Sequence, residues 1–231
     1  MRAIYQFGKT KRLSCISHLD LQRFMQMALR RTQLPVAYSQ GFNPHPLLSF
    51  ASALAMGWTS DVELMDIKLA APITPEFALE QMKSALPPDL PIHAVRFVED
   101  SHPALMAKLQ MADYVISLTG EGVSAIVNAI EGYLKQTEVI AMRKTKSGIK
   151  PTDIRPWSVA VDSKQTDVGY NIYARLALTE RATLKPDLLL RVLAERAGTE
   201  DYRANIHRTA LLTPSADGQA VVDLFEYDAQ F

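Results

Sequence analysis

Cysteine is nearly absent from this sequence, which has a single one, Cys15, among 231 residues. A disulfide within the chain is therefore excluded, and a small secreted disulfide scaffold is disfavoured. A self-supplied iron–sulfur cluster is excluded as well, because such clusters are typically held by four thiolates. Cys15 precedes a predicted helix, and we expect it to be a buried bystander rather than a reactive thiol.

Long hydrophobic runs are also missing. The longest apolar stretch, Leu47–Trp58, is interrupted by Ser49 and Ser52 and is shorter than the ~20 residues that span a bilayer. The N-terminus leads into alternating residues rather than a charged head followed by an apolar core, so no signal peptide is predicted. With 48% hydrophobic and 22% charged residues, the composition is that of a globular protein. We expect a cytoplasmic, non-membrane protein.

Catalytic and metal-binding motifs are lacking too. No His-x-x-x-His or Cys-x-x-Cys spacing, nucleophile elbow, Walker motif or dinucleotide fingerprint occurs. Gly120-Glu121-Gly122 lacks the third glycine and the lysine of a phosphate loop. We therefore predict no metal and no cofactor, leave catalytic residues unknown, and favour an accessory protein over an enzyme.

Net charge is zero, but the charges are segregated along the chain. The segment from Arg2 to Arg31 holds seven basic residues against Asp20 alone. The segment from Asp61 to Asp100 holds eight acidic residues against three basic ones, and Arg143–Arg155 holds five basic residues against Asp153. This distribution predicts a molecule with basic and acidic sides.

The periodicity of the first half predicts the order β-α-β-β-α-β. Strands are expected at 3–7, 47–55, 62–69 and 92–98, and helices at 18–31 and 75–86. Ser17 is a predicted N-cap with Asp20 as its acidic partner. Leu21, Met25, Ala28 and Leu29 recur at the spacing of a buried helical stripe.

The second half is predicted to repeat this order, with strands at 113–119, 170–178 and 205–211 and helices around 123–134 and 186–197. The segments 139–143 and 157–161 flank a basic loop between the first helix and the strand at 170–178. The predicted fold is α+β, with two tandem ferredoxin-like βαββαβ units and mostly antiparallel sheets. We expect one domain over 1–101, with an inserted proline-rich loop at 36–46. A second is expected over 102–231, with a basic hairpin at 143–156.

Three features are candidate binding sites. The loop Tyr38–Pro46 is stiffened by two prolines, so it can present Phe42 and His45 for stacking; a rigid connection with Phe42 in the core is the alternative. The other two features are basic groups. Together the three features supply the residues that we expect to contact nucleic acid, with Tyr38 added from the base of the loop. These residues are Arg12, Arg23, Arg30, Arg31, Tyr38, Phe42, His45, Lys144, Lys146 and Arg155.

The two basic groups have different settings. Arg23 and Arg30 share a helix face, with Arg12 and Arg31 nearby, and could hold phosphates or form an ordinary solvated surface. Lys144 and Lys146 lie at a hairpin tip around Gly148. Asp153 and Arg155 share one side of an extended segment, where each could orient the other or a ligand; a structural pair is the favoured interpretation for Asp153.

Several stretches of the sequence are distinctive. They include Ser17-His18-Leu19-Asp20, the run Tyr38-Ser39-Gln40-Gly41-Phe42-Asn43-Pro44-His45-Pro46, Gly57 with Ser60 and Glu63, and Asp153-Ile154-Arg155-Pro156. On these residues the chain resembles the bacterial radical-SAM-linked proteins, over nearly its whole length. The resemblance implies a link to a radical S-adenosylmethionine (SAM) enzyme. Because this chain has no Cys-x-x-x-Cys-x-x-Cys motif, that enzyme would act in trans.

Three functions are compatible with these features. The leading hypothesis is an accessory RNA-binding module that serves a radical SAM enzyme in RNA modification or processing. The second is a protein-interaction subunit of such an enzyme that docks through the acidic stretch Asp61–Asp100 without RNA contact. The third is an enzyme of unknown type with a site between the two domains, using His18, His45 or Arg155. The oligomeric state is left open.

Overall fold

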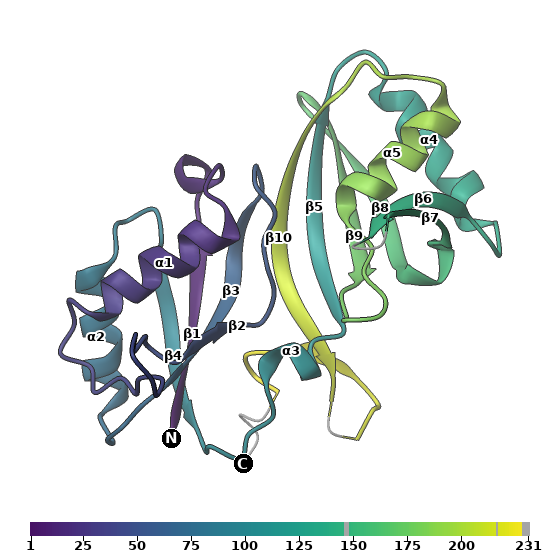
Figure 1. The fold of residues 1–231 in the computed structure, drawn as a ribbon. Coiled ribbons are helices and arrows are strands. Elements are labelled where there is room, and N and C mark those ends of the chain that lie inside the picture. The colour runs from purple at the N-terminus through teal and green to yellow at the C-terminus, as the bar shows by residue number, and fades with distance from the viewer. Residues whose placement is uncertain (146–147, 216, 228–231) are drawn as a thin grey trace. The chain divides into compact units, whose positions relative to one another are not determined.

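The computed structural model describes residues 1–145, 148–215 and 217–227 (Figure 1). The chain forms two compact units. The first consists of Met1–Leu109 and the described part of the C-terminal segment from Thr213, and the second is Gln110–Leu212. This division differs from the predicted border at 101 in assigning 102–109 and the C-terminal segment to the first unit.

The first unit contains one sheet and two long helices. Its elements are β1 (Arg2–Lys9), α1 (His18–Leu29), β2 (Leu48–Phe50), β3 (Thr59–Lys68), α2 (Pro75–Ala85), β4 (Ile92–Val98), the short helix α3 (Leu105–Lys108) and the short strand β11 (Val221–Asp223). β1 lies between β4 and β3, and β2 pairs with β3, all antiparallel. The predicted order of the six main elements is confirmed, and a connection that contains Gly57 joins β2 to β3.

Helix α1 begins where the capping residues predict. The Ser17 hydroxyl accepts a hydrogen bond of 3.2 Å from the Asp20 backbone N–H and donates one of 2.7 Å to the Asp20 carboxylate. The predicted stripe is confirmed, because the buried residues of α1 are Leu21, Met25, Ala28 and Leu29. Such a stripe needs an apolar surface to cover, and the sheet supplies one.

The core of the first unit lies between the helices and the sheet. Alternate residues of β1, Ala3, Tyr5 and Phe7, are buried together with Met25 of α1 and Met82 of α2. The Tyr5 hydroxyl donates 3.3 Å to the carbonyl oxygen of Ala78, which satisfies a polar group that burial would otherwise leave unpaired. Burying a large apolar side chain such as Phe7, Met25 or Met82 contributes about 1.5–3 kcal/mol.

The second unit has the same arrangement of strands. Its elements are β5 (Met111–Thr119), α4 (Val123–Leu134), β6 (Ile140–Thr145), β7 (Gly148–Asp153), β8 (Ser158–Thr166), β9 (Gly169–Ala177), α5 (Pro186–Ala197) and β10 (Arg203–Pro214). The sheet order is β10-β5-β9-β8, with every neighbouring pair antiparallel. The chain is thus a mixed α+β protein with mostly antiparallel sheet.

The segment 143–156, where a basic hairpin is expected, overlaps the strands β6 and β7. β6 and β7 form a separate two-stranded antiparallel sheet, with Pro151 opposite Met142 and Lys150 opposite Arg143. A proline has no N–H for a ladder and is found in strands chiefly at edges. In a two-stranded sheet both strands are edges, so Pro151 can be accommodated in β7, although a proline counts against a strand in a sequence pattern.

Within the described part of the chain, no helix combines the length and apolar character that crossing a bilayer requires.

Candidate nucleic-acid interface

The loop Tyr38–Pro46 is closed at its base. Tyr38 and Pro46 form an antiparallel bridge, and the Ser39 backbone N–H donates 2.9 Å to the carbonyl oxygen of His45. In return the His45 backbone N–H donates 3.1 Å to the Ser39 hydroxyl oxygen. Gly41 turns the chain at φ +120°, which side chains disfavour. The loop is therefore a preset platform.

Phe42 lies fully in solvent, with an exposed fraction of 105%. The alternative in which its ring enters the core is wrong. The His45 imidazole is also exposed, and its Nδ1 is held 2.9 Å from the Ser39 hydroxyl. Tyr38 is exposed at the base of the same loop. The three predicted contact residues of the loop are thus brought together on one exposed segment.

The arginines around α1 form weak local contacts. Arg23 lies 3.5 Å from Asp20 and Arg12 lies 3.6 Å from Asp89, and the two arginine side chains are 74% and 82% exposed. Ion pairs this exposed contribute about 0–1 kcal/mol. Arg31 donates 3.1 Å to the carbonyl oxygen of Ala85, and Arg30 is exposed just after the helix. These guanidinium groups remain accessible to a visiting phosphate.

The basic hairpin of the second unit is anchored on one side. Arg143 packs its guanidinium over the Trp157 ring at 5.1 Å, and Arg191 of α5 donates 2.8 Å to the carbonyl oxygen of Met142. Lys144 and Lys150 are exposed. Lys146 lies outside the described residues.

Arg155 has a different environment from the other predicted contact residues. Its guanidinium is partly buried and donates 3.1 Å to the carbonyl oxygens of both Ser158 and Leu134. The Asp153 carboxylate accepts from the backbone N–H groups of Val139 (2.9 Å) and Arg155 (3.0 Å). Asp153 thus caps two backbone N–H groups, which is a structural role but a different one from the favoured ion pair with Arg155. A nucleic-acid contact by Arg155 stays a prediction.

Sequence patterns missed a buried ionisable cluster where β1 leads into α1. Lys9 is 1% exposed and Glu63 is also buried, and His18 begins the helix. The Lys9 ammonium donates 3.1 Å to the carbonyl oxygens of Ser14 and Ile16. Burial lowers the pKa of Lys9, opposed by the negative charge of Glu63. The only signal was the presence of His18 and Glu63 among the residues that carry the family resemblance.

His18 is also partly buried, and its ring packs edge-on against Phe50 with 5.2 Å between the ring centroids. Burial lowers its pKa, Glu63 raises it, and Lys9 lowers it again. Cys15, at the edge of this cluster, is exposed, so its expected burial is wrong. The loop 10–17 turns its backbone carbonyls toward Lys9, which leaves the thiol on the outside.

The acidic residues of the stretch Asp61–Asp100 lie in different environments. Asp66 is buried and paired with Arg2, and Glu63 is buried as described above. Asp89 accepts from the Thr10 hydroxyl at 3.0 Å, and Asp100 lies 3.6 Å from Lys68. Much of the charge that favoured acidic docking is therefore used inside the first unit.

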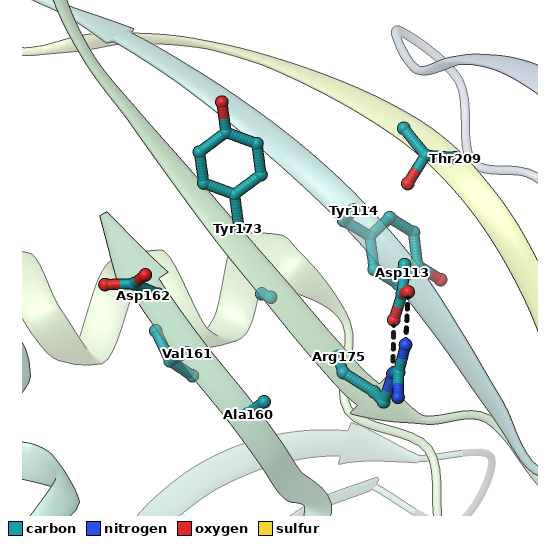
Figure 2. Close-up of a pocket in the computed structure, with 9 residues that line it drawn as sticks. Asp113, Tyr114, Ala160, Val161, Asp162, Tyr173, Arg175 and Thr209 are labelled. Atoms are coloured by element: carbon teal, nitrogen blue, oxygen red, sulfur yellow. Dashed lines mark hydrogen bonds and ion pairs between the residues drawn. The ribbon is translucent and has the colours of Figure 1, made fainter. Parts of the chain in front are cut away.

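A groove on the sheet of the second unit was also missed (Figure 2). It encloses about 400 Å³ and is lined by side chains of β5, β8, β9 and β10, among them Asp113, Asp162, Tyr173, Arg175 and Thr209. Arg175 donates two hydrogen bonds of 2.8 Å to the Asp113 carboxylate. The signal was the alternation of the strand predicted at 170–178, which places Tyr173 and Arg175 on the same face.

Metal ligands are not gathered anywhere in the described ranges 1–145, 148–215 and 217–227, where no group of three or more His, Cys, Asp or Glu side chains could hold an ion.

The predicted contact residues divide between the units. Those of α1 and the Tyr38–Pro46 loop belong to the first, and those of the hairpin and Arg155 belong to the second.

Comparison with solved structures shows a likeness of fold. The chain is similar to a chain in the crystal structure of a Cbf5-Nop10-Gar1 complex, with a TM-score of 0.53 and 8% sequence identity. The match covers 90% of this chain and 48% of the other, so this chain spans about half the length of that one. At this identity the likeness concerns the fold alone.

Comparison by sequence gives a family. No protein with a curated description matches this chain. One family profile, described as "Uncharacterized protein conserved in bacteria (DUF2344)", matches residues 2–186, which is most of the chain. The protein therefore belongs to this conserved bacterial family, DUF2344.

Proposed function

We propose that this protein is a cytoplasmic accessory module that binds RNA and works in trans with a radical SAM enzyme in RNA modification or processing. The observation that carries the RNA part is Phe42, whose ring is fully exposed on a loop closed by main-chain and Ser39 hydrogen bonds. The proposal takes each unit as ferredoxin-like, which the repeated strand order supports.

The exposure of Phe42 has an energetic meaning. Leaving such a ring in water forgoes about 1.5–3 kcal/mol of burial, and the Tyr38–Pro46 loop holds it there instead of turning it inward. Stacking of a base on an aromatic ring contributes about 1–3 kcal/mol and occurs with any base. A rigid exposed ring with His45 nearby therefore suits an unpaired RNA segment.

The arginines around α1 supply the complementary charge. The Arg12 and Arg23 side chains are highly exposed, so they can exchange their carboxylate partners for phosphate at little cost, because surface ion pairs contribute about 0–1 kcal/mol. Arg30 and Arg31 follow directly after the C-terminal end of α1. Phosphate contacts dominate nucleic-acid affinity through counterion release. Lys144 on the hairpin of the second unit would add a separate contact.

The partnership with a radical SAM enzyme rests on the family resemblance and on the cysteine content. A chain whose only cysteine is Cys15 cannot supply the thiolates of a cluster. The reactive chemistry would then belong to the partner, and this protein would hold the RNA substrate.

Binding of a fluorescent single-stranded RNA to the full chain tests the RNA part. We expect Phe42→Ala to weaken binding about 5- to 150-fold, the equivalent of one lost stack, and to leave the thermal midpoint unchanged because the ring touches solvent only. Val168→Ala is the matched control, since Val168 is an exposed apolar side chain of a turn in the second unit. Equal affinity of wild type and Phe42→Ala would overturn the assignment of Phe42.

A second candidate function is direct binding of the partner enzyme through the exposed face of α1, without RNA between the two proteins. Leu19 and Met27, eight residues apart, are both exposed and lie on the same side as Arg23. A double variant, Leu19→Ser with Met27→Ser, should then release a co-purified radical SAM protein after nuclease treatment. If RNA binding alone joins the two proteins, nuclease releases the partner from the wild type as well.

A further inference from the structure

The sheet of the second unit has a face on which side chains from four strands line up. One row runs across the four strands. In it Tyr173 of β9 is paired with Asp162 of β8 on one side and with Val115 of β5 on the other, and Val115 is paired with His207 of β10. The buried residues of β9 are Ile172, Ala174 and Leu176, so Tyr173 and Arg175 point to the opposite side. Tyr173 is 43% exposed there.

Arg175 is oriented in this groove by its neighbour. Its Nε and Nη2 donate to the two carboxylate oxygens of Asp113, a bidentate pairing that fixes the plane of the guanidinium. Nη1 takes no part in that pairing and keeps its N–H donors for another acceptor. Figure 2 shows the pair joined across two adjacent strands, with Tyr173 further along β9.

Asp162 lies beside Tyr173 across the strand pair. One of its carboxylate oxygens accepts from the Ser163 backbone N–H at 2.7 Å. The other oxygen can accept a hydrogen bond from a ligand held against Tyr173. The groove thus combines an aromatic face, an oriented cation and a carboxylate acceptor within about 400 Å³, a volume typical of small-ligand sites.

We propose that this groove binds one nucleotide of a single-stranded RNA, with the base stacked on Tyr173, the phosphate at Arg175 and a base amino group donating to Asp162. Tyr173 and Arg175 are two residues apart, so their side chains start about 7 Å from each other, with room for the ribose between base and phosphate. The inference rests on the proposed RNA-binding function and adds a second stacking position with base preference.

The base preference follows from the chemistry of Asp162. A carboxylate accepts from the amino group of cytosine, whereas uracil has a carbonyl oxygen at the same ring position and would meet the carboxylate as a second acceptor. Pentacytidine should therefore bind more tightly than pentauridine. The two oligonucleotides carry the same number of phosphates, so the comparison isolates the base edge.

The test measures both oligonucleotides on the full chain at one salt concentration. Tyr173→Ala should weaken pentacytidine binding about 5- to 150-fold, as expected for one stack, while Tyr173→Phe should keep most of it. Asp162→Asn should reduce the preference for pentacytidine over pentauridine. Val168→Ala, in the turn between β8 and β9, is the control. Circular dichroism and thermal midpoints establish that each variant folds.

The outcomes separate this inference from the proposed function. Loss of binding in Phe42→Ala with unchanged binding in Tyr173→Ala would overturn the groove and leave the RNA-binding function standing. Loss in Tyr173→Ala but not in Phe42→Ala would support the groove and contradict the role of Phe42. If the wild-type protein does not bind RNA, both the proposed function and the groove site are contradicted. An unchanged base preference in Asp162→Asn would refute the role of Asp162.

Discussion

Lys9 donates a hydrogen bond of 3.1 Å from its ammonium group to the carbonyl oxygen of Ser14, and its side chain is almost completely buried. The same ammonium reaches the carbonyl oxygen of Ile16. These contacts pin the loop between β1 and α1 against the sheet. This buried cation therefore helps to hold the N-terminal end of α1, the helix that carries Arg23.

Removal of this cation should destabilise the first unit. Lys9→Met keeps much of the side-chain volume but takes the positive charge away from two carbonyl oxygens and from the buried Glu63. Breaking a buried charged network costs about 3–5 kcal/mol, and we expect a loss of unfolding free energy of that size in urea titrations. Lys11→Met, at an exposed position of the same loop, should change stability by less than about 0.5 kcal/mol. Equal effects of the two variants would contradict the pinning role.

The stability of the protein should depend on His18 in mildly acidic solution. Because burial lowers its folded-state pKa, the unfolded chain binds more protons between that pKa and the ordinary value of about 6.5. The contribution of His18 should therefore rise with pH through this interval and be complete above about pH 6.5. NMR titration of the imidazole measures this pKa directly. The charged neighbours of His18 act on it in opposite directions, since Glu63 raises the pKa and Lys9 lowers it.

A variant at the same position separates His18 from other titrating groups. His18→Gln should flatten the dependence of unfolding free energy on pH in that interval. An imidazole titrating above 6.5, or a pH profile that is the same in His18→Gln, would show that burial does not control this group.

Gly120 should be intolerant of any side chain. Its φ is +130°, and a Cβ there would lie 2.7 Å from the Asp201 carbonyl oxygen and 2.9 Å from the Tyr202 Cα. Backbone strain of this kind costs about 1–3 kcal/mol, so we expect Gly120→Ala to lower the thermal midpoint. Gly132 is the contrasting site, because it lies within α4 with nothing within 4 Å of a Cβ. Gly132→Ala should stabilise by about 0.5–1 kcal/mol.

Salt dependence should report the role of Arg30. On a single strand, each phosphate that the protein neutralises adds about 0.7 to the steepness of log affinity against log salt. Arg30→Gln should therefore make the slope shallower by about that amount, with a uniform loss of affinity across RNA sequences. Arg181→Gln, at an exposed position in the β9–α5 connection, should leave the slope unchanged. A slope that Arg30→Gln does not alter would remove this arginine from the interface.

Local signals in the sequence determined where the main helices of the first unit begin and which face α1 buries. Ser17 and Asp20 specify the start of α1, Thr74 and Pro75 the start of α2, and the stripe beginning at Leu21 the face that α1 buries. Each of these depends on residues a few positions apart, so a sequence pattern contains all the physical information required. The exposed platform around Phe42 was also indicated in this way, because prolines and glycine act on their immediate neighbours.

Tertiary structure alone decided where the charges and grooves lie. Lys9 and Glu63 are 54 positions apart, and only the pairing of β1 with β3 buries them near each other. The groove at Tyr173 needs strands from four places in the chain, and β7 is paired with β6 in a two-stranded sheet. Burial of a charge depends on the dielectric surroundings that distant segments create together, and no local pattern of residues contains that information.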